Sequence, residues 1–201
     1  MRHPLRIVVL ARHGESRGNA ERRVSGNPAV DVPLTERGVE QARTLGLQVA
    51  GLALDACLHT RFPRTRATAE LALAGREDVP LLEEPLFDDV DVGELDGAEL
   101  ERYREWKRAH TRADAFPGGE SLDDAAARYA AGLRSILASP YRSLLVVCHE
   151  IPIRYALNAV AGSDSFDGPA HTIGNAVPHL FDDEGLERAV QGIERILRIS
   201  P

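Results

Sequence analysis

The chain has 201 residues, and 24 lysines and arginines stand against 31 aspartates and glutamates, for a formal net charge of −7. A chain of this length fits one domain with a sizeable apolar core, so we predict a single domain over residues 1–201. The acidic balance and the lack of a basic block in the sequence argue against nucleic acid and anionic membranes as partners. The sequence leaves the oligomeric state open.

The cysteines and the apolar runs indicate the compartment. Cys57 and Cys148 are too few for a disulfide framework, and both lie in runs typical of strands, which predicts buried free thiols. The first apolar run begins at Leu5 and leaves no room for a signal peptide. No apolar stretch reaches the roughly 20 residues that span a bilayer. We therefore expect a cytoplasmic protein.

Runs typical of strands alternate with amphipathic segments along the chain. Strands are predicted at 5–10, 54–58, 79–82, 143–147 and 176–181. Helices are predicted at 35–51, 65–73, 99–110, 121–138 and 153–161, with a last helix at the C-terminus. Thr35 is a typical N-cap, and Ser121 with Asp124 forms a capping-box pattern. The alternation predicts an α/β layer architecture.

Basic and imidazole side chains follow three of the predicted strands. The strand at 5–10 leads to Arg12 and His13, and two later strands lead to Arg64 and to His149. Sheets of α/β proteins place their chemistry at the carboxyl ends of strands. Two arginines and two histidines gathered there would form an anion-selective pocket, and phosphate is the commonest oxyanion ligand.

These motifs resemble the histidine phosphatase superfamily, whose branches include cofactor-dependent phosphoglycerate mutases. The matching segments are Arg12-His13-Gly14-Glu15-Ser16, Leu34-Thr35-Glu36-Arg37-Gly38 with Gln41-Ala42, Arg64 with Thr68-Ala69-Glu70, Pro117-Gly118-Gly119-Glu120-Ser121, and Val146-Val147-Cys148-His149 with Ile153-Arg154. They follow the family's order across residues 5–180. The resemblance implies a three-layer α/β/α sandwich with a mostly parallel central sheet, of the phosphoglycerate mutase-like type.

The resemblance also implies a covalent mechanism. His13 would attack phosphorus as a neutral imidazole and form a phosphohistidine, which water then hydrolyses. Arg12, Arg64 and His149 match the family's phosphate ligands and would stabilise charge on the equatorial oxygens. Asn19 matches a further polar contact in the same pocket. No residue spacing in the sequence requires a metal ion or another cofactor.

A carboxylic acid should face His13 across the phosphate, because the leaving oxygen needs a proton. The family usually places a glutamate four residues before a glycine, and Gly93 counts back to Asp89. Asp89 is therefore the predicted general acid. Asp88 and Asp91 are alternatives if the register of this loop shifts.

Two positions depart from the family's pattern. Arg61 belongs to a segment where small hydroxyl residues are common, and it either adds a cation at the pocket rim or points to solvent. Glu150 stands where glycine is common. It either hydrogen-bonds an imidazole or opposes a bulky anionic substrate, or it is the N-terminal carboxylate of the next helix. Of the remaining histidines, neither His171 nor His179 is expected to contact substrate.

The predicted function is a metal-independent phosphomonoesterase acting on a small phosphorylated metabolite. Resembling mutases carry a long insertion after the acid-bearing segment that shields the phosphoenzyme from water, whereas residues 89–116 offer little beyond one helix. A phosphoglycerate mutase-type isomerase and a non-catalytic phospho-ligand binding module are the alternatives. The pocket walls are expected from loops at 15–32, 84–97 and 162–175, and the sequence does not name the substrate.

Overall fold

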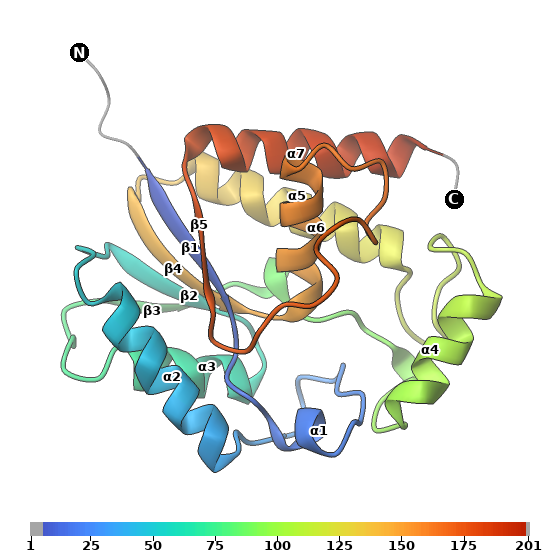
Figure 1. Cartoon of the computed structure of the whole chain (residues 1–201), viewed down its shortest axis with the longest axis horizontal. Helices are drawn as coiled ribbons and strands as arrows, with labels where there is room; N and C mark the ends of the chain where they lie inside the picture. Colours follow the sequence, from blue (N-terminus) through green and yellow to red (C-terminus); the bar gives the residue numbers. More distant parts are fainter. Residues whose placement is uncertain (1–5, 200–201) are drawn as a thin grey trace.

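The computed structural model describes residues 6–199, and its five strands form one sheet between two layers of helices (Figure 1). The strands are β1 (Ile7–Arg12), β2 (Ala56–His59), β3 (Leu81–Glu83), β4 (Ser143–Cys148) and β5 (Pro178–Phe181). Their order in the sheet is β3-β2-β4-β1-β5. All neighbouring pairs are parallel except β1 and β5, which are antiparallel. The predicted three-layer α/β/α sandwich with a mostly parallel central sheet is thus confirmed.

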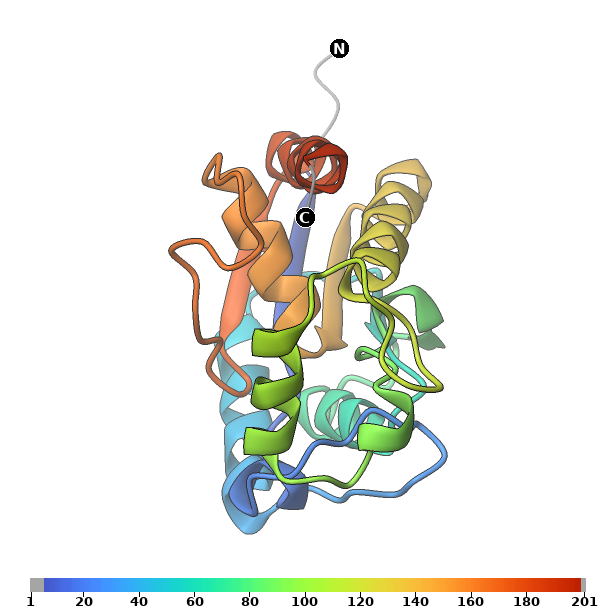
Figure 2. The same ribbon diagram turned by 90° about the vertical axis from the view of Figure 1, so that its right-hand side faces the viewer.

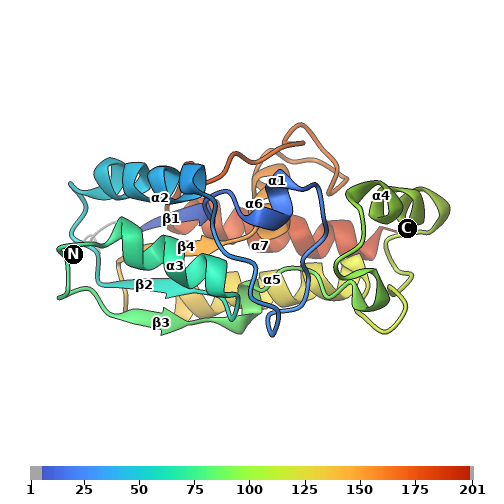
Figure 3. The same ribbon diagram turned by 90° about the horizontal axis from the view of Figure 1, so that it is seen from below.

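The helices divide between the two faces of the sheet. They are α1 (Arg17–Ala20), α2 (Glu36–Val49), α3 (Pro63–Ala72), α4 (Leu100–Ala109), α5 (Leu122–Ala138), α6 (Glu150–Val160) and α7 (Asp183–Arg198), with 3-10 turns η1 (Pro85–Phe87) and η2 (Gly93–Leu95). Helices α5, α6 and α7 cover one face, and α2 and α3 cover the other (Figures 1 and 3). Helix α4 stands apart from both layers at one end of the molecule (Figures 1 and 3), the end that faces the viewer in Figure 2. No helix within residues 6–199 is long and apolar enough to cross a membrane.

Alternation along β1 assigns successive side chains to two separate cores. Val8 and Leu10 pack in the core under α5, α6 and α7, whereas Val9 and Ala11 pack against α2 and α3. All four are fully buried, as expected of an interior parallel strand that is covered on both faces. This double coverage holds the end of β1, and the residues that follow it, in a fixed position.

The predicted helix caps are confirmed. The Thr35 hydroxyl accepts a hydrogen bond from the Gly38 amide at 3.0 Å, at the start of α2. Ser121 Oγ accepts from the Asp124 amide at 3.0 Å, and the Asp124 carboxylate accepts from the Ser121 amide at 3.1 Å. These bonds satisfy amide groups that the first turn of a helix leaves without partners.

Several predicted boundaries are shifted by two or three residues; for example, the strand predicted from residue 79 begins at Leu81, and the helix predicted from residue 65 begins at Pro63. Two other shifts have a visible cause. The last strand begins at Pro178 and not at Ala176, because Ala176 has a φ of 54°, in the left-handed region and outside extended geometry. Helix α6 begins at Glu150 and not at Ile153. The earlier start puts Pro152 in the first turn, where its missing N–H costs no helical hydrogen bond. Residue 5, where the first strand was expected to begin, lies outside the described residues.

Both cysteines are buried free thiols, as predicted. Burial raises the pKa of Cys57 to about 12 and also raises the pKa of Cys148. The thiolate forms are therefore scarce near neutral pH, and neither residue resembles a reactive nucleophile.

Candidate active site

A cavity of about 620 Å³ lies where β1 and the segments after the other strands meet. The predicted site residues that line it are Arg12, His13, Asn19, Arg64 and Asp89. His149 lies directly behind the cavity, fully buried, and contacts both Arg64 and Asp89. The structure thus brings all six predicted residues together, from four segments that are far apart in the sequence.

The hydrogen bonds of His13 fix its protonation state. Its Nδ1 lies 2.7 Å from the Gly14 carbonyl oxygen, which can only accept, so Nδ1 carries the proton. Its Nε2 lies 3.1 Å from Nε of Arg64, which can only donate, so Nε2 presents its lone pair. Burial, and then the charges of Arg64 and Arg12, hold the pKa of His13 well below its usual value. The imidazole is therefore neutral, with Nε2 available as a nucleophile.

Arg64 links His13 to the rest of the site. It sits in the first turn of α3 and is 3% exposed. Its Nη1 donates to Ser25 Oγ at 3.0 Å, and its Nη2 donates to the Ser25 carbonyl oxygen at 2.9 Å. The sequence did not single out Ser25, because nothing in its local pattern predicts where the loop before α2 folds back. The planar guanidinium is consequently held in one orientation toward His13.

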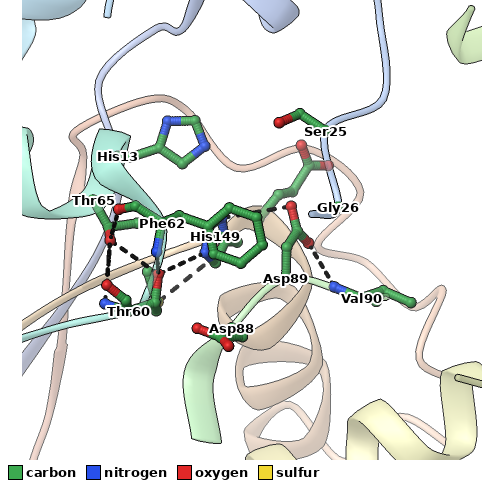
Figure 4. Close-up of polar contacts among 12 residues, drawn as sticks. His13, Ser25, Gly26, Thr60, Phe62, Thr65, Asp88, Asp89, Val90 and His149 are labelled. Carbon is green, nitrogen blue, oxygen red and sulfur yellow. Dashed lines mark hydrogen bonds and ion pairs between the residues drawn. The ribbon is translucent and has the colours of Figure 1, made fainter. Parts of the chain in front are cut away.

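A chain of hydroxyl groups orients His149 (Figure 4). Thr65 Oγ1 donates to the Phe62 carbonyl oxygen at 2.8 Å and lies 2.9 Å from Thr60 Oγ1, which lies 3.0 Å from His149 Nε2. Because the Thr65 hydroxyl already donates its proton to the Phe62 carbonyl, the Thr60 hydroxyl must donate to Thr65. Thr60 then accepts a hydrogen bond from His149 Nε2. His149 Nδ1 is then free to accept from Arg64 Nη2 at 3.3 Å. Burial, followed by Arg64, holds the pKa of His149 well below its usual value.

Asp89 faces the same cluster from the other side (Figure 4). Its Oδ2 lies 3.4 Å from Arg64 Nη2 and 3.5 Å from His149 Nδ1. Burial raises the pKa of this carboxyl group, and the charge of Arg64 opposes the rise only in part. A carboxyl group that keeps its proton to higher pH is suited to act as a general acid.

The alternative carboxylates, Asp88 and Asp91, form hydrogen bonds with other groups. Asp88 accepts from the Arg61 amide at 3.0 Å and from Arg61 Nε at 2.5 Å. Asp91 accepts from the Gly93 amide at 2.9 Å and is exposed. Among the described residues, Asp89 is the member of this trio that lines the main cavity.

Arg61 does not add a cation to the rim of the main cavity. It is paired with Asp88 and lines a neighbouring cavity of about 550 Å³. Its side chain is 54% exposed, so of the two alternatives the solvent-facing arginine is confirmed.

Glu150 has one of the predicted roles and one that was not predicted. It is the first residue of α6, where the helix dipole favours a carboxylate. Its Oε2 also pairs with Arg12 Nη1 at 2.8 Å, and the same nitrogen donates to the Ile173 carbonyl oxygen at 2.8 Å. Within the described part of the chain, Nε of Arg12 has no hydrogen-bond partner. Arg12 is thus anchored at one end and keeps a buried donor for an anion.

The model of the histidine phosphatase superfamily (branch 1) matches residues 8–193 of this chain. The chain belongs to this superfamily. Membership makes it an enzyme that acts on phosphate monoesters, as the resemblance implied.

Individual relatives agree with this assignment. The protein "Probable phosphoglycerate mutase GpmB" of Salmonella choleraesuis is 31% identical over 163 residues, which cover 77% of this chain and 74% of that protein. The alpha-ribazole phosphatase of Shigella flexneri has a TM-score of 0.73 at 23% identity, covering 87% of this chain and 89% of that one. A mycobacterial glucosyl-3-phosphoglycerate phosphatase has a TM-score of 0.73 at 22% identity, covering 89% and 91%. The two solved structures establish a shared fold.

Helix α4 of this histidine phosphatase was predicted at 99–110, but its place in the wall of the cavity was not. The segment between Asp89 and Phe116 was expected to leave little material around the pocket, but α4 forms one wall of the cavity. The wall residues are Tyr103, Arg104, Lys107 and Arg108. Their spacing of three or four residues was the available signal, since such residues share one helix face.

The loop after α6 supplies a further part of the wall, next to α4. His171, which was not expected to approach the substrate, lines the cavity together with Thr172 and Asp167. The expectation that the loops at 15–32, 84–97 and 162–175 form pocket walls is confirmed.

Proposed function

We propose that this histidine phosphatase is a metal-independent phosphomonoesterase that acts through a phosphohistidine on a small phosphorylated metabolite. One observation carries the proposal. The guanidinium of Arg64 contacts His13 Nε2 at 3.1 Å and the Asp89 carboxyl at 3.4 Å, so it joins a neutral nucleophile to a carboxyl group with a raised pKa. A phosphoryl group bound on this guanidinium has the attacking nitrogen and the proton donor within reach.

The reaction follows from these positions. The Nε2 lone pair of His13 forms a bond to phosphorus while the bond from phosphorus to the ester oxygen breaks. That oxygen leaves with the bonding electrons and takes the proton of Asp89. Asp89, now a carboxylate, removes a proton from a water molecule whose oxygen attacks phosphorus. The phosphorus–nitrogen bond breaks, and its electron pair returns to Nε2.

Fixed cations stabilise the charge that develops during both steps. Arg12 and Arg64 present guanidinium donors that need no reorganisation when the equatorial oxygens gain charge. Asn19 adds its side-chain amide, because its Oδ1 already accepts from the Ser16 amide at 3.1 Å and leaves Nδ2 as a donor. Positive charge from arginine thus fills the role that metal ions have in other phosphatases.

The size of the cavity and the relatives support a metabolite as substrate. A volume of about 620 Å³ lies within the range of small-molecule sites. Two structural relatives carry names that describe phosphatases of metabolites. The buried free thiols of Cys57 and Cys148 support a cytoplasmic location, where thiols stay reduced.

A mutase is the second candidate, because a relative with 31% identity is named as a phosphoglycerate mutase. A mutase must hold the phosphoenzyme away from water until the product is phosphorylated again. Assays with 3-phosphoglycerate separate the candidates, since a phosphatase releases inorganic phosphate and a mutase forms 2-phosphoglycerate. A non-catalytic binding module is disfavoured because the nucleophile and both phosphate-binding arginines are present.

The decisive experiment measures phosphate release from p-nitrophenyl phosphate, with a metal chelator present, by the wild type and by His13→Ala. We expect turnover by the wild type, loss of at least 10³-fold in the variant, and an acid-labile phosphohistidine that appears only in the wild type. His110→Ala, which changes an exposed histidine outside the cavity, is the matched control. Turnover that survives in His13→Ala would refute the proposed nucleophile.

A further inference from the structure

The cavity is cationic although the chain as a whole is acidic. Seven arginine and lysine side chains line it against three carboxylates, whereas the whole chain has a formal net charge of −7. Arg12 and Arg64 are the two cations next to the nucleophile. The other five extend beyond the phosphate site, and they are Arg23, Arg104, Lys107, Arg108 and Arg154. One phosphoryl group needs only the first two, so the remaining positive charge calls for a separate explanation.

Arg154 of α6 is the most deeply placed of these further cations. Its side chain is 12% exposed, and its Nη2 lies 3.3 Å from an oxygen of Asp167 without forming a hydrogen bond. Among residues 6–199, neither Nε nor Nη2 of Arg154 has a hydrogen-bond partner. Buried donors without an acceptor are costly, and a bound oxyanion would remove that cost.

Lys107 of α4 faces the same place from the other wall. Its Nζ lies 3.8 Å from Asp167, so one carboxylate that is 62% exposed is shared between Lys107 and Arg154. The side chain of Lys107 is 23% exposed, and burial lowers its pKa. Arg104, one turn earlier on α4, lines the cavity beside it. Arg104 also pairs with Glu101 at 3.6 Å, outside the cavity lining, so two exposed carboxylates face three cations. Exposed ion pairs of this kind contribute little stability.

The other carboxylates of the cavity do not neutralise this group. Glu150 lies 3.9 Å from Arg154 Nη1, but its closer partner is Arg12 at 2.8 Å. Asp89 pairs with Arg64 at 3.4 Å and lies 3.5 Å from His149 Nδ1, so its charge is placed at the phosphate end of the cavity. A surplus of positive charge therefore remains between α4 and α6.

We propose that Arg104, Lys107 and Arg154 form a subsite for a second anionic group of the substrate. The substrate class is then phosphomonoesters that carry a carboxylate or a second phosphate at the end away from the scissile bond. This inference rests on the proposed function, because the position of the scissile phosphate at His13 defines which end of the substrate reaches the subsite. Neutral sugar or alcohol phosphates would leave Arg154 without an acceptor and bind less well.

Matched substrates that differ in one charge test the subsite. 3-Phosphoglycerate is compared with glycerol 3-phosphate, and 6-phosphogluconate with sorbitol 6-phosphate, since each pair exchanges a carboxylate for a hydroxymethyl group. The wild type should favour the carboxylate in at least one pair by about tenfold in kcat/KM, mainly through KM. Raising the ionic strength should reduce this ratio. Ratios near one in both pairs would overturn the inference.

Variants that remove one positive charge test whether the preference for a carboxylate arises at the proposed subsite. Lys107→Gln and Arg154→Gln should each lower the ratio to about threefold or less. Arg188→Gln removes the same charge from an exposed site on α7 and should keep the wild-type ratio. Lys107 lies on a helix surface, so Lys107→Gln tests the subsite even if Arg154→Gln does not fold. An unchanged ratio in Lys107→Gln and in folded Arg154→Gln would contradict the assignment.

Binding separates this inference from the proposed function. Calorimetric titration of His13→Ala with each member of the two pairs measures the charge preference without turnover. A preference for the carboxylate in binding, with no phosphatase activity in the wild type, would support the subsite and refute the proposed function. Turnover of p-nitrophenyl phosphate without any charge preference in binding would support the proposed function and refute the subsite.

Discussion

Asp89→Asn offers a sharp test of the proposed mechanism. The substitution keeps the size of the side chain but removes the proton that the leaving oxygen needs. General acids contribute about 10²–10⁴-fold to catalysis, equivalent to about 3–5 kcal/mol of barrier. The contacts of Asp89 with Arg64 and His149, at 3.4 and 3.5 Å, are longer than strong charge-assisted hydrogen bonds. Little positioning should therefore be lost, and the effect should fall on kcat.

The leaving group decides how much of this loss is seen. An alkyl phosphate such as glycerol 3-phosphate needs its alkoxide protonated, so kcat for Asp89→Asn should fall by about 10²–10³-fold. p-Nitrophenol leaves readily as its anion, so the loss with p-nitrophenyl phosphate should stay within about tenfold. Steady-state kinetics with both substrates measure the difference. Equal losses with both, or a loss confined to KM, would mean that Asp89 only positions Arg64.

The same carboxyl group should set the alkaline limb of the pH profile. The pKa of Asp89 is raised, so its active protonated form is present at low pH and is lost as pH rises through that pKa. The pKa of His13 is lowered, so its active neutral form persists until pH falls through that pKa. We therefore expect kcat/KM for an alkyl phosphate to be greatest at acidic pH. In Asp89→Asn the alkaline limb should disappear, and a profile identical to the wild type would contradict this assignment.

Two further substitutions test positioning and packing. Thr60→Val removes the hydroxyl that accepts from His149 Nε2 at 3.0 Å, so kcat should fall about tenfold. Thr60→Ser keeps the hydroxyl and should retain activity. Equal kcat values for the two variants would refute the inference that Thr60 holds the proton of His149 on Nε2. Gly14→Ala would place a Cβ 2.3 Å from the carbonyl oxygen of Gly38, and chemical denaturation should give a loss of about 2 kcal/mol or more. Gly51→Ala is the control, because a Cβ there meets nothing within 4 Å, and it should change the free energy of unfolding by less than about 0.5 kcal/mol. Similar losses of stability at both glycines would contradict the steric explanation.

The residues of the proposed phosphate site could be predicted from the sequence because they follow strands. Parallel strands of one sheet end at the same edge, so the positions of Arg12, His13 and His149 along the chain already bring them together. Asp89 was found by its spacing from Gly93, which the structure explains. Gly93 has a φ of 50°, and a Cβ there would lie 2.1 Å from the Pro117 carbonyl oxygen, so the turn that follows the acid requires glycine.

The side chains around the phosphate site could not be predicted in the same way. Arg61 and Arg64 lie in one short segment, yet the first pairs with Asp88 and the second enters the cavity. Ser25 reaches Arg64 only because the loop before α2 folds back over α3. No periodicity encodes such contacts, since they depend on the path of the loops between regular elements.

The sequence by itself determined the fold class, the family resemblance and the residues that we propose to bind and attack a phosphoryl group. Their order in the chain is enough, because strand alternation and helix caps act over a few residues. Only the tertiary structure decided what surrounds the phosphoryl group. The charged face of α4 is visible in the sequence, but its position across the cavity from Arg154 depends on packing between segments about 50 residues apart. The chemistry therefore follows from local pattern, whereas the choice of substrate follows from how distant elements pack.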